Sequence, residues 1–172
     1  MPDSQTPNLQ KAQDIARTAQ VFAIIALVLL VVTIVFNGGF PIGRLLIADD
    51  LEWRERVNEG GLILIHLFPT LFFYAAVNHL HKALQHYGDG DFFASAAADN
   101  VAKSGEYAVE GMIGVILIVP LLTLWVGERS GGFDINLEPE AIGMLAVAFF
   151  ISAIGRVLSA ATQLKAENEA FV

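Results

Sequence analysis

Long apolar segments, separated by shorter polar ones, dominate the pattern of this chain. Four of them, each of about the length (roughly 20 residues) with which a helix crosses a bilayer, cover residues 20–36, 61–80, 107–126 and 141–160. A buried helix of a soluble protein can be as apolar as one of these, but four in a chain of 172 residues leave too little polar surface to cover them. The pattern predicts an all-α integral membrane protein, in which four transmembrane helices form two antiparallel hairpins within one membrane domain, residues 1–172.

Glycine, proline and capping residues predict where helices begin and end. The segment "NGGFP", residues 37–41, contains two glycines and a proline and predicts the end of the first helix. Asp49 and Glu52 have the spacing of a capping box, which predicts a short interfacial helix with Trp53 at headgroup depth. Further along, an alanine-rich stretch predicts another short helix that ends at Gly105.

The composition supports a membrane protein and excludes several functional classes. Charged residues make up 16% of the chain and hydrophobic residues 55%, whereas about a quarter of a typical soluble domain is charged. There is no cysteine, which excludes disulfides, thiolate metal sites and cysteine nucleophiles. The net charge of −8, with 10 basic residues scattered among 18 acidic ones, argues against direct binding of nucleic acid. The first apolar segment is expected to stay in the mature chain, because no A-x-A-like cleavage site follows it.

Basic residues in the polar segments predict the orientation. With an even number of spans, both ends of the chain lie on one side of the membrane, together with the connection of residues 81–106 and the tail of residues 161–172. That side carries more basic residues than the other: Lys11, Arg17, Lys82, Lys103, Arg156 and Lys165, against Arg44, Arg54, Arg56 and Arg129. By the positive-inside rule, we expect a bacterial inner-membrane protein with cytoplasmic N- and C-termini.

Two charged residues lie inside predicted spans. Glu110 is near the start of the third span and Arg156 near the end of the fourth, so both lie close to the inner boundary of the membrane. An unpaired charge in hydrocarbon costs about 3 kcal/mol on insertion scales, and we therefore expect a structural pair between Glu110 and Arg156. Two alternatives are open. Each side chain reaches the interface by itself, or both belong to a proton or ion relay, for which these spans offer few further polar groups.

One histidine, His66, also lies within a span. Haem needs axial ligands that face it from two sides, and the other three spans contain no histidine, so a haem held by two histidines of one chain is excluded. We expect His66 to make a polar contact, as a neutral imidazole hydrogen-bonded to a carbonyl or hydroxyl group of a neighbouring helix. No cofactor is predicted.

Proline and small residues shape the predicted helices. Pro69 and Pro120 predict kinks, which serve packing or open a cavity for a ligand. Small residues recur along one face of each of the last two spans and predict close helix contact there. They are Gly111 and Gly114 in the third span, and Ala148, Ser152, Gly155 and Ser159 in the fourth.

The connection of residues 81–106 and the tail of residues 161–172 are predicted to form one inner surface. The candidate residues of this surface are His81, His86, Asp89, Asp91, Lys103, Lys165 and Glu167. The histidines lack the spacing of three or four residues that presents two ligands on one helix face, so a solvated surface is a better interpretation than a metal site. We expect this surface to contact a protein partner.

Two short patterns carry a family resemblance. The tail has a Leu-basic-x-Glu-x-x-x-x-Val pattern at Leu164, Lys165, Glu167 and Val172, and the connection has a matching spacing at Phe93, Val101 and Gly105. In both, the chain resembles a bacterial family of four-span membrane proteins catalogued only as a domain of unknown function. The connection of that family is rich in arginine, whereas this one offers Lys103. Family members are often encoded beside a small helix-turn-helix regulator, so the resemblance implies a membrane anchor or antagonist of such a regulator.

Three functions are compatible with the sequence. The preferred one is a non-catalytic protein that acts through protein interaction, as an anchor, sensor or regulator of a partner. The alternatives are a small transporter or channel, and an accessory subunit of a larger membrane complex. The chain has no G-x-S-x-G, H-E-x-x-H or phosphate-binding loop, so no enzyme is expected. The expected partners are membrane lipid and either another protein or further copies of the chain.

Overall fold

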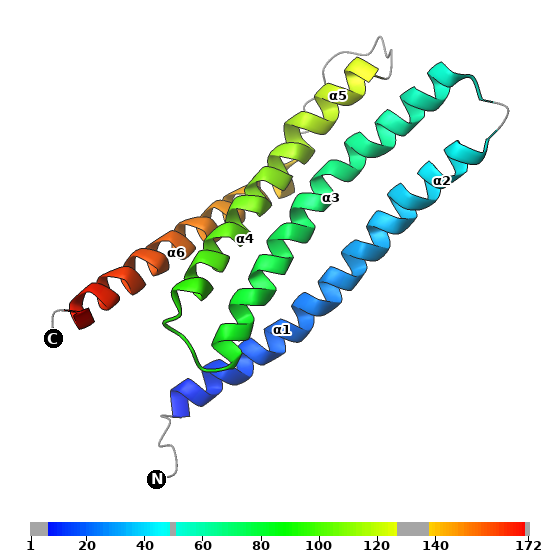
Figure 1. Ribbon diagram of the computed structural model, residues 1–172. Coiled ribbons are helices and arrows are strands. Elements are labelled where there is room, and N and C mark those ends of the chain that lie inside the picture. Colours follow the sequence, from blue (N-terminus) through cyan, green and yellow to red (C-terminus); the bar gives the residue numbers. More distant parts are fainter. Residues whose placement is uncertain (1–6, 49–50, 127–137, 171–172) are drawn as a thin grey trace.

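The computed structural model describes residues 7–48, 51–126 and 138–170 and arranges them in four helical rods (Figure 1). The first rod consists of α1 (Pro7–Ile34), a π-helical turn (Val35–Gly39) and α2 (Phe40–Ile47). The second is α3 (Trp53–Gly88). The third consists of α4 (Ser95–Ile113), a second π-helical turn (Gly114–Ile118) and α5 (Val119–Val126), and the fourth is α6 (Pro139–Ala170). All 4 rods are long and apolar enough to cross a membrane, which confirms the predicted fold class.

Small side chains fill the interior of the protein, and large apolar ones cover the outside. Most of the buried apolar residues are alanines: Ala16, Ala23, Ala76, Ala83, Ala97, Ala98, Ala102 and Ala148. In contrast, the side chains of Phe22 and Phe150 are each 68% exposed. Such a surface would be a large uncovered apolar patch in water, whereas lipid tails cover it in a bilayer. The chain is a multi-pass membrane protein.

The rods pack in chain order. α1 packs against α3, α3 against α4, and α4 against α6. Figure 1 shows the first three rods side by side and antiparallel, with α6 crossing α4 obliquely. The N-terminal part of α1, the link of residues 89–94 and the C-terminal part of α6 lie at one end, which we call the terminal end. α2 and α5 lie at the opposite, far end.

Each π-helical turn ends two residues before a proline. In each, the residue before the proline donates its N–H to the carbonyl five residues earlier. In the first rod, Phe40 donates to the carbonyl of Val35 and is followed by Pro41. In the third rod, Val119 donates to the carbonyl of Gly114 and is followed by Pro120. A proline has no N–H, and its ring clashes with the carbonyl four residues before it. The wider π-helical turn makes room for the ring, so that the helix continues.

The predicted helix end at residues 37–41 is therefore wrong. The chain stays helical through this segment to Ile47. Two glycines and a proline end a helix in water because the solvent takes over the freed backbone groups. Hydrocarbon cannot do so, and a wider helical turn keeps most of these groups bonded.

The link between α3 and α4 is much shorter than the predicted connection. α3 runs unbroken from Trp53 to Gly88, and α4 begins at Ser95. The short interfacial helix predicted around Trp53 is thus the first turn of α3, and Asp49 of the predicted capping box lies outside the described residues. In the link, Gly90 has a φ of 89°, a value that favours glycine. Most of residues 81–106 belong to long helices that extend past the apolar segments.

Glycines set the distance between α4 and α6. A Cβ atom built on Gly105 would lie 2.2 Å from the main-chain nitrogen of Ser152, and one built on Gly155 would lie 2.2 Å from that of Ala102. Only glycine lets two backbones approach so closely. The small face predicted for the fourth span is thus in contact with α4. The predicted helix end at Gly105 is wrong, because α4 continues through this residue to Ile113.

Candidate functional site

Polar side chains form a stripe along one face of α4, beside its crossing with α6. Asp99, Lys103, Glu106 and Glu110 follow one another at intervals of four, three and four residues, which places them on one side of a helix. Across the crossing, α6 contributes Arg156, Ser159 and Gln163. We call these seven residues the polar face. A groove of about 410 Å³ lies within it, lined by all of them except Glu110 together with Ala102 and Ala160.

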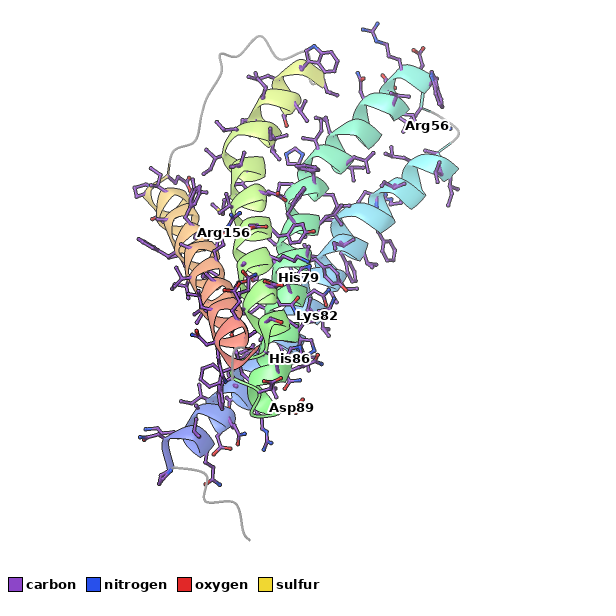
Figure 2. All side chains as sticks on the ribbon, turned by 60° about the vertical axis from the view of Figure 1, so that its left-hand side comes forward. Arg56, His79, Lys82, His86, Asp89 and Arg156 are labelled. Carbon is purple, nitrogen blue, oxygen red and sulfur yellow. The ribbon has the colours of Figure 1, made fainter. Side chains whose placement is uncertain are left out.

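Two side-chain contacts join the helices across this groove. Arg156 Nη2 donates to Glu106 Oε1 at 2.7 Å, and Ser159 Oγ donates to Asp99 Oδ1, also at 2.7 Å. Figure 2 shows Arg156 where α6 meets α4. The arginine and glutamate side chains are 71% and 41% exposed, so in water the pair would contribute little to stability. The contacts show which parts of the two stripes lie opposite each other.

The predicted pair between Glu110 and Arg156 is wrong, because Arg156 pairs with Glu106, one helical turn closer to the terminal end. The close approach of Gly105 to Ser152 sets the register of the two antiparallel helices. When this register is extended by five residues, Glu110 lies level with Val147. Val147 is nine residues, or about 13 Å, from Arg156 along α6. The prediction counted residues from the ends of the apolar segments and placed Glu110 and Arg156 at the same depth. This count misses the displacement of α6 along α4.

The side chain of Glu110 is exposed and has no hydrogen-bond or ion-pair partner within the described part of the chain. Its depth follows from its neighbour Gly111, on which a Cβ atom would lie 2.8 Å from Phe73 of α3. Phe73 is seven residues from Leu80, the end of the second apolar segment, which corresponds to about 10 Å. Glu110 thus lies between one and two turns inside the apolar part of the protein.

The polar face ends at Glu110. The next positions on the same side of the third rod are Ile113, Leu117 and Leu121, which are 38%, 43% and 52% exposed. A conducting path along this face would need polar groups there. The arrangement is a polar surface that enters the membrane from the terminal end and stops.

The link and the tail are joined at the terminal end, as predicted for one inner surface. The ammonium group of Lys165 on α6 lies 4.3 Å from the centre of the Phe93 ring in the link. Arg17 of α1 donates from Nε to the carbonyl of Gly88 at 3.1 Å, which ties the first rod to the end of α3. Three rods thus meet around the residues 89–94, while Glu167 is exposed further along α6.

The other residues of the predicted inner surface lie on α3 and in the link. His81 accepts a hydrogen bond at Nε2 from Gln85 (3.2 Å), and the carbonyl of His86 accepts one from the main-chain N–H of Asp91 (2.9 Å). Figure 2 shows His79 and His86 following one another along α3 toward the terminal end, with Asp89 directly after the helix. Among the described residues, no three His, Cys, Asp or Glu side chains are grouped closely enough to bind a metal ion.

A polar contact between α3 and α4 was not predicted. His79 Nδ1 lies 2.8 Å from Asn100 Oδ1, and the ring of His79 stacks on Tyr107 with 5.3 Å between centroids. Asn100 also donates to the carbonyl of Ala96. The three residues belong to three different predicted segments. A separate short helix ending at Gly105 was predicted, whereas Asn100 and Tyr107 lie on one continuous helix, two turns apart.

His66 makes a different contact from the predicted one. Its Nδ1 donates to the carbonyl of Leu62 at 2.8 Å, within its own helix rather than to a neighbouring one. The ring lines a cavity of about 340 Å³ between α3 and the first rod, which also contains Asn37 and Thr70. The polar contact expected for His66 is thus made within α3.

A protein-family model for proteins of unknown function, DUF2975, matches residues 45–172. This is well over half of the chain. The chain belongs to the DUF2975 family. The match begins at Leu45 in α2 and includes α3 to α6, so the whole polar face lies within the part shared with other DUF2975 proteins, whereas α1 precedes it. No curated protein and no solved structure matches this DUF2975 protein.

Proposed function

We propose that this protein is a non-catalytic membrane protein that binds a protein partner through its polar face. In this proposal the chain lies in the bacterial inner membrane with the terminal end in the cytoplasm, as the distribution of basic residues predicts. The anchor or antagonist of a small regulator, which the family resemblance implies, is one form of this function.

The observation that carries the proposal is the unpartnered carboxylate of Glu110 within the apolar part of the protein. A charged side chain in hydrocarbon is costly, by about 3 kcal/mol at the bilayer centre on insertion scales, and such residues are usually paired or functional. Glu106 on the same stripe is paired with Arg156, whereas the side chains of Glu110 and Lys103 have no partner among the described residues. A second protein that supplies a complementary charge would remove this cost.

Charge complementarity indicates the kind of partner. A transmembrane helix that carries Lys or Arg at the depth of Glu110 would pair with its carboxylate, and an acidic group nearer the terminal end would pair with Lys103. A second copy of the chain that docked by the same face around a twofold axis would place acidic stripes opposite each other, and like charges at close range are unfavourable. The face therefore favours a different protein.

The experiment is purification of the tagged protein from its own membranes, followed by quantification of what co-purifies. We expect a partner whose recovery falls at least several-fold in Glu110→Gln, which removes the charge and keeps the shape. Glu55→Gln, an exposed acid of α3 at the far end, is the control and should leave recovery unchanged. Equal recovery with wild type, Glu110→Gln and Glu55→Gln would contradict the proposal.

A further inference from the structure

A cavity of about 630 Å³ opens between α2 and α3 at the far end of the protein. Its volume is within the range of about 300–1,000 Å³ typical of sites for small molecules. Apolar walls come from Phe36, Phe40 and Ile63, and two charged residues of opposite sign, Arg44 and Glu59, also line it. The cavity belongs to a part of the molecule that the polar face does not use.

The charged residues lie at the depth of lipid headgroups. Leu45 of α2 is next to Gly60 of α3, where a Cβ atom would be 3.9 Å from the leucine side chain, so Arg44 and Glu59 are at the same level. Glu59 directly precedes the apolar segment of residues 61–80. Ile63 lies within that segment. Phe36 and Phe40 belong to the first rod and lie at the level of that segment. The cavity thus has a charged mouth at the membrane boundary and apolar walls on the side of the bilayer.

The charged side chains of Arg44 and Glu59, at the mouth of the cavity, are available to contact a ligand. Among the described residues, neither the side chain of Arg44 nor that of Glu59 has a hydrogen-bond or ion-pair partner, and the two do not pair with each other. Both side chains are exposed. Arg56, by comparison, donates to the carbonyl groups of Ala48 and Leu51 and has a structural role in the segment before α3.

We propose that this cavity binds a zwitterionic phospholipid with a primary ammonium group, such as phosphatidylethanolamine. The acyl chain packs against the phenylalanine and isoleucine walls. The guanidinium of Arg44 donates to the lipid phosphate, for which its geometry is well suited. The ammonium group of the lipid donates to the carboxylate of Glu59.

The two charges together distinguish between lipids. Phosphatidylcholine has a quaternary ammonium group without an N–H and cannot donate a hydrogen bond to Glu59. Phosphatidylglycerol has the phosphate for Arg44 but brings no cation to Glu59. Only a headgroup with both a phosphate and a protonated amine satisfies both side chains.

The test measures binding of these three lipids, with identical acyl chains, to the purified full-length protein in detergent by native mass spectrometry. We expect phosphatidylethanolamine to bind about three- to tenfold more tightly than the other two, as one additional charge-assisted hydrogen bond at an exposed site allows. Glycerophosphoethanolamine, which has the headgroup but no chains, should not bind. Equal affinity for the three lipids would overturn the proposal, and so would tight binding of the chain-free headgroup.

Two variants assign the preference to the cavity. Glu59→Gln should remove the preference for phosphatidylethanolamine over phosphatidylglycerol, and Arg44→Gln should weaken binding of all three lipids. The controls are Glu55→Gln, one turn before Glu59 and outside the cavity, and Lys11→Gln at the terminal end, both of which should leave the preference intact. Circular dichroism verifies that each variant is folded. A preference that persists in folded Glu59→Gln would refute the assignment of the ammonium site.

Discussion

The crossing of α4 and α6 should be exceptionally sensitive to a single added methyl group. Gly105→Ala and Gly155→Ala each place a Cβ atom 2.2 Å from a main-chain nitrogen of the other helix, where ordinary contact begins at 3.4 Å. Because the obstructing atoms are backbone, no side-chain rotation relieves the clash. The helices must move apart by about 1 Å or tilt.

The expected cost follows from what this movement disrupts. Overpacking of a well-packed interface typically costs about 1–3 kcal/mol, and α4 is the main neighbour of α6. Separation would also lengthen the contacts of Arg156 with Glu106 and of Ser159 with Asp99, both at 2.7 Å. We expect each variant to lose about 2–3 kcal/mol of the free energy of unfolding. The double variant should lose less than the sum, because helices that one methyl group has already separated accommodate the second.

The assay is unfolding of the purified protein in mixed micelles with increasing SDS, monitored by far-ultraviolet circular dichroism. The matched control is Gly143→Ala on the same helix, where an added Cβ atom meets nothing within 4 Å. Alanine favours a helix over glycine by up to about 1 kcal/mol, so this variant should be neutral or slightly stabilised. If all three single variants unfolded like the wild type, the close crossing of α4 and α6 would be refuted.

Three further predictions use other parts of the structure. In a double-mutant cycle, Glu106→Gln and Arg156→Gln should show a coupling of about 0.5 kcal/mol, whereas Glu110→Gln and Arg156→Gln should be additive; coupling only in the second cycle would contradict the observed ion pair. Because the chain has no cysteine, single cysteines at Ser95 and Glu55 can be labelled in intact cells with an impermeant reagent, which should modify only the one at Glu55; the reverse result would invert the topology. Deletion of Glu167 to Val172 should release a co-purifying partner while leaving membrane insertion intact, and unchanged recovery would remove the tail from the interaction surface.

Length and composition were sufficient to predict the four spans, since the bilayer selects apolar helices by these properties alone. The small residues of the fourth span also correctly predicted the face that contacts another helix, because close contact between membrane helices needs small residues. The proximity of link and tail, seen in the contact of Lys165 with Phe93, follows from an even number of spans.

Two of the errors share a physical cause, which is that local signals were interpreted as they act in water. Residues 37–41 do not end a helix where no solvent replaces the backbone hydrogen bonds, and Gly105 serves a helix crossing rather than a helix end. The partner of Arg156 depends on the register of two helices, which the contact of Gly105 with Ser152 determines. No count from the boundary of an apolar segment contains this tertiary information.

The most direct test of the proposed interaction is photo-crosslinking in living cells from a photoreactive amino acid at Lys103, in the middle of the polar face. The control is the same amino acid at Leu29, whose side chain is 61% exposed and which lies on α1, outside the polar face. We predict a crosslinked protein adduct of one defined mass from position 103, absent from position 29 and lost when Glu110→Gln is introduced. The same adducts from both positions, or an adduct from position 103 that persists in Glu110→Gln, would contradict a partner held by the polar face.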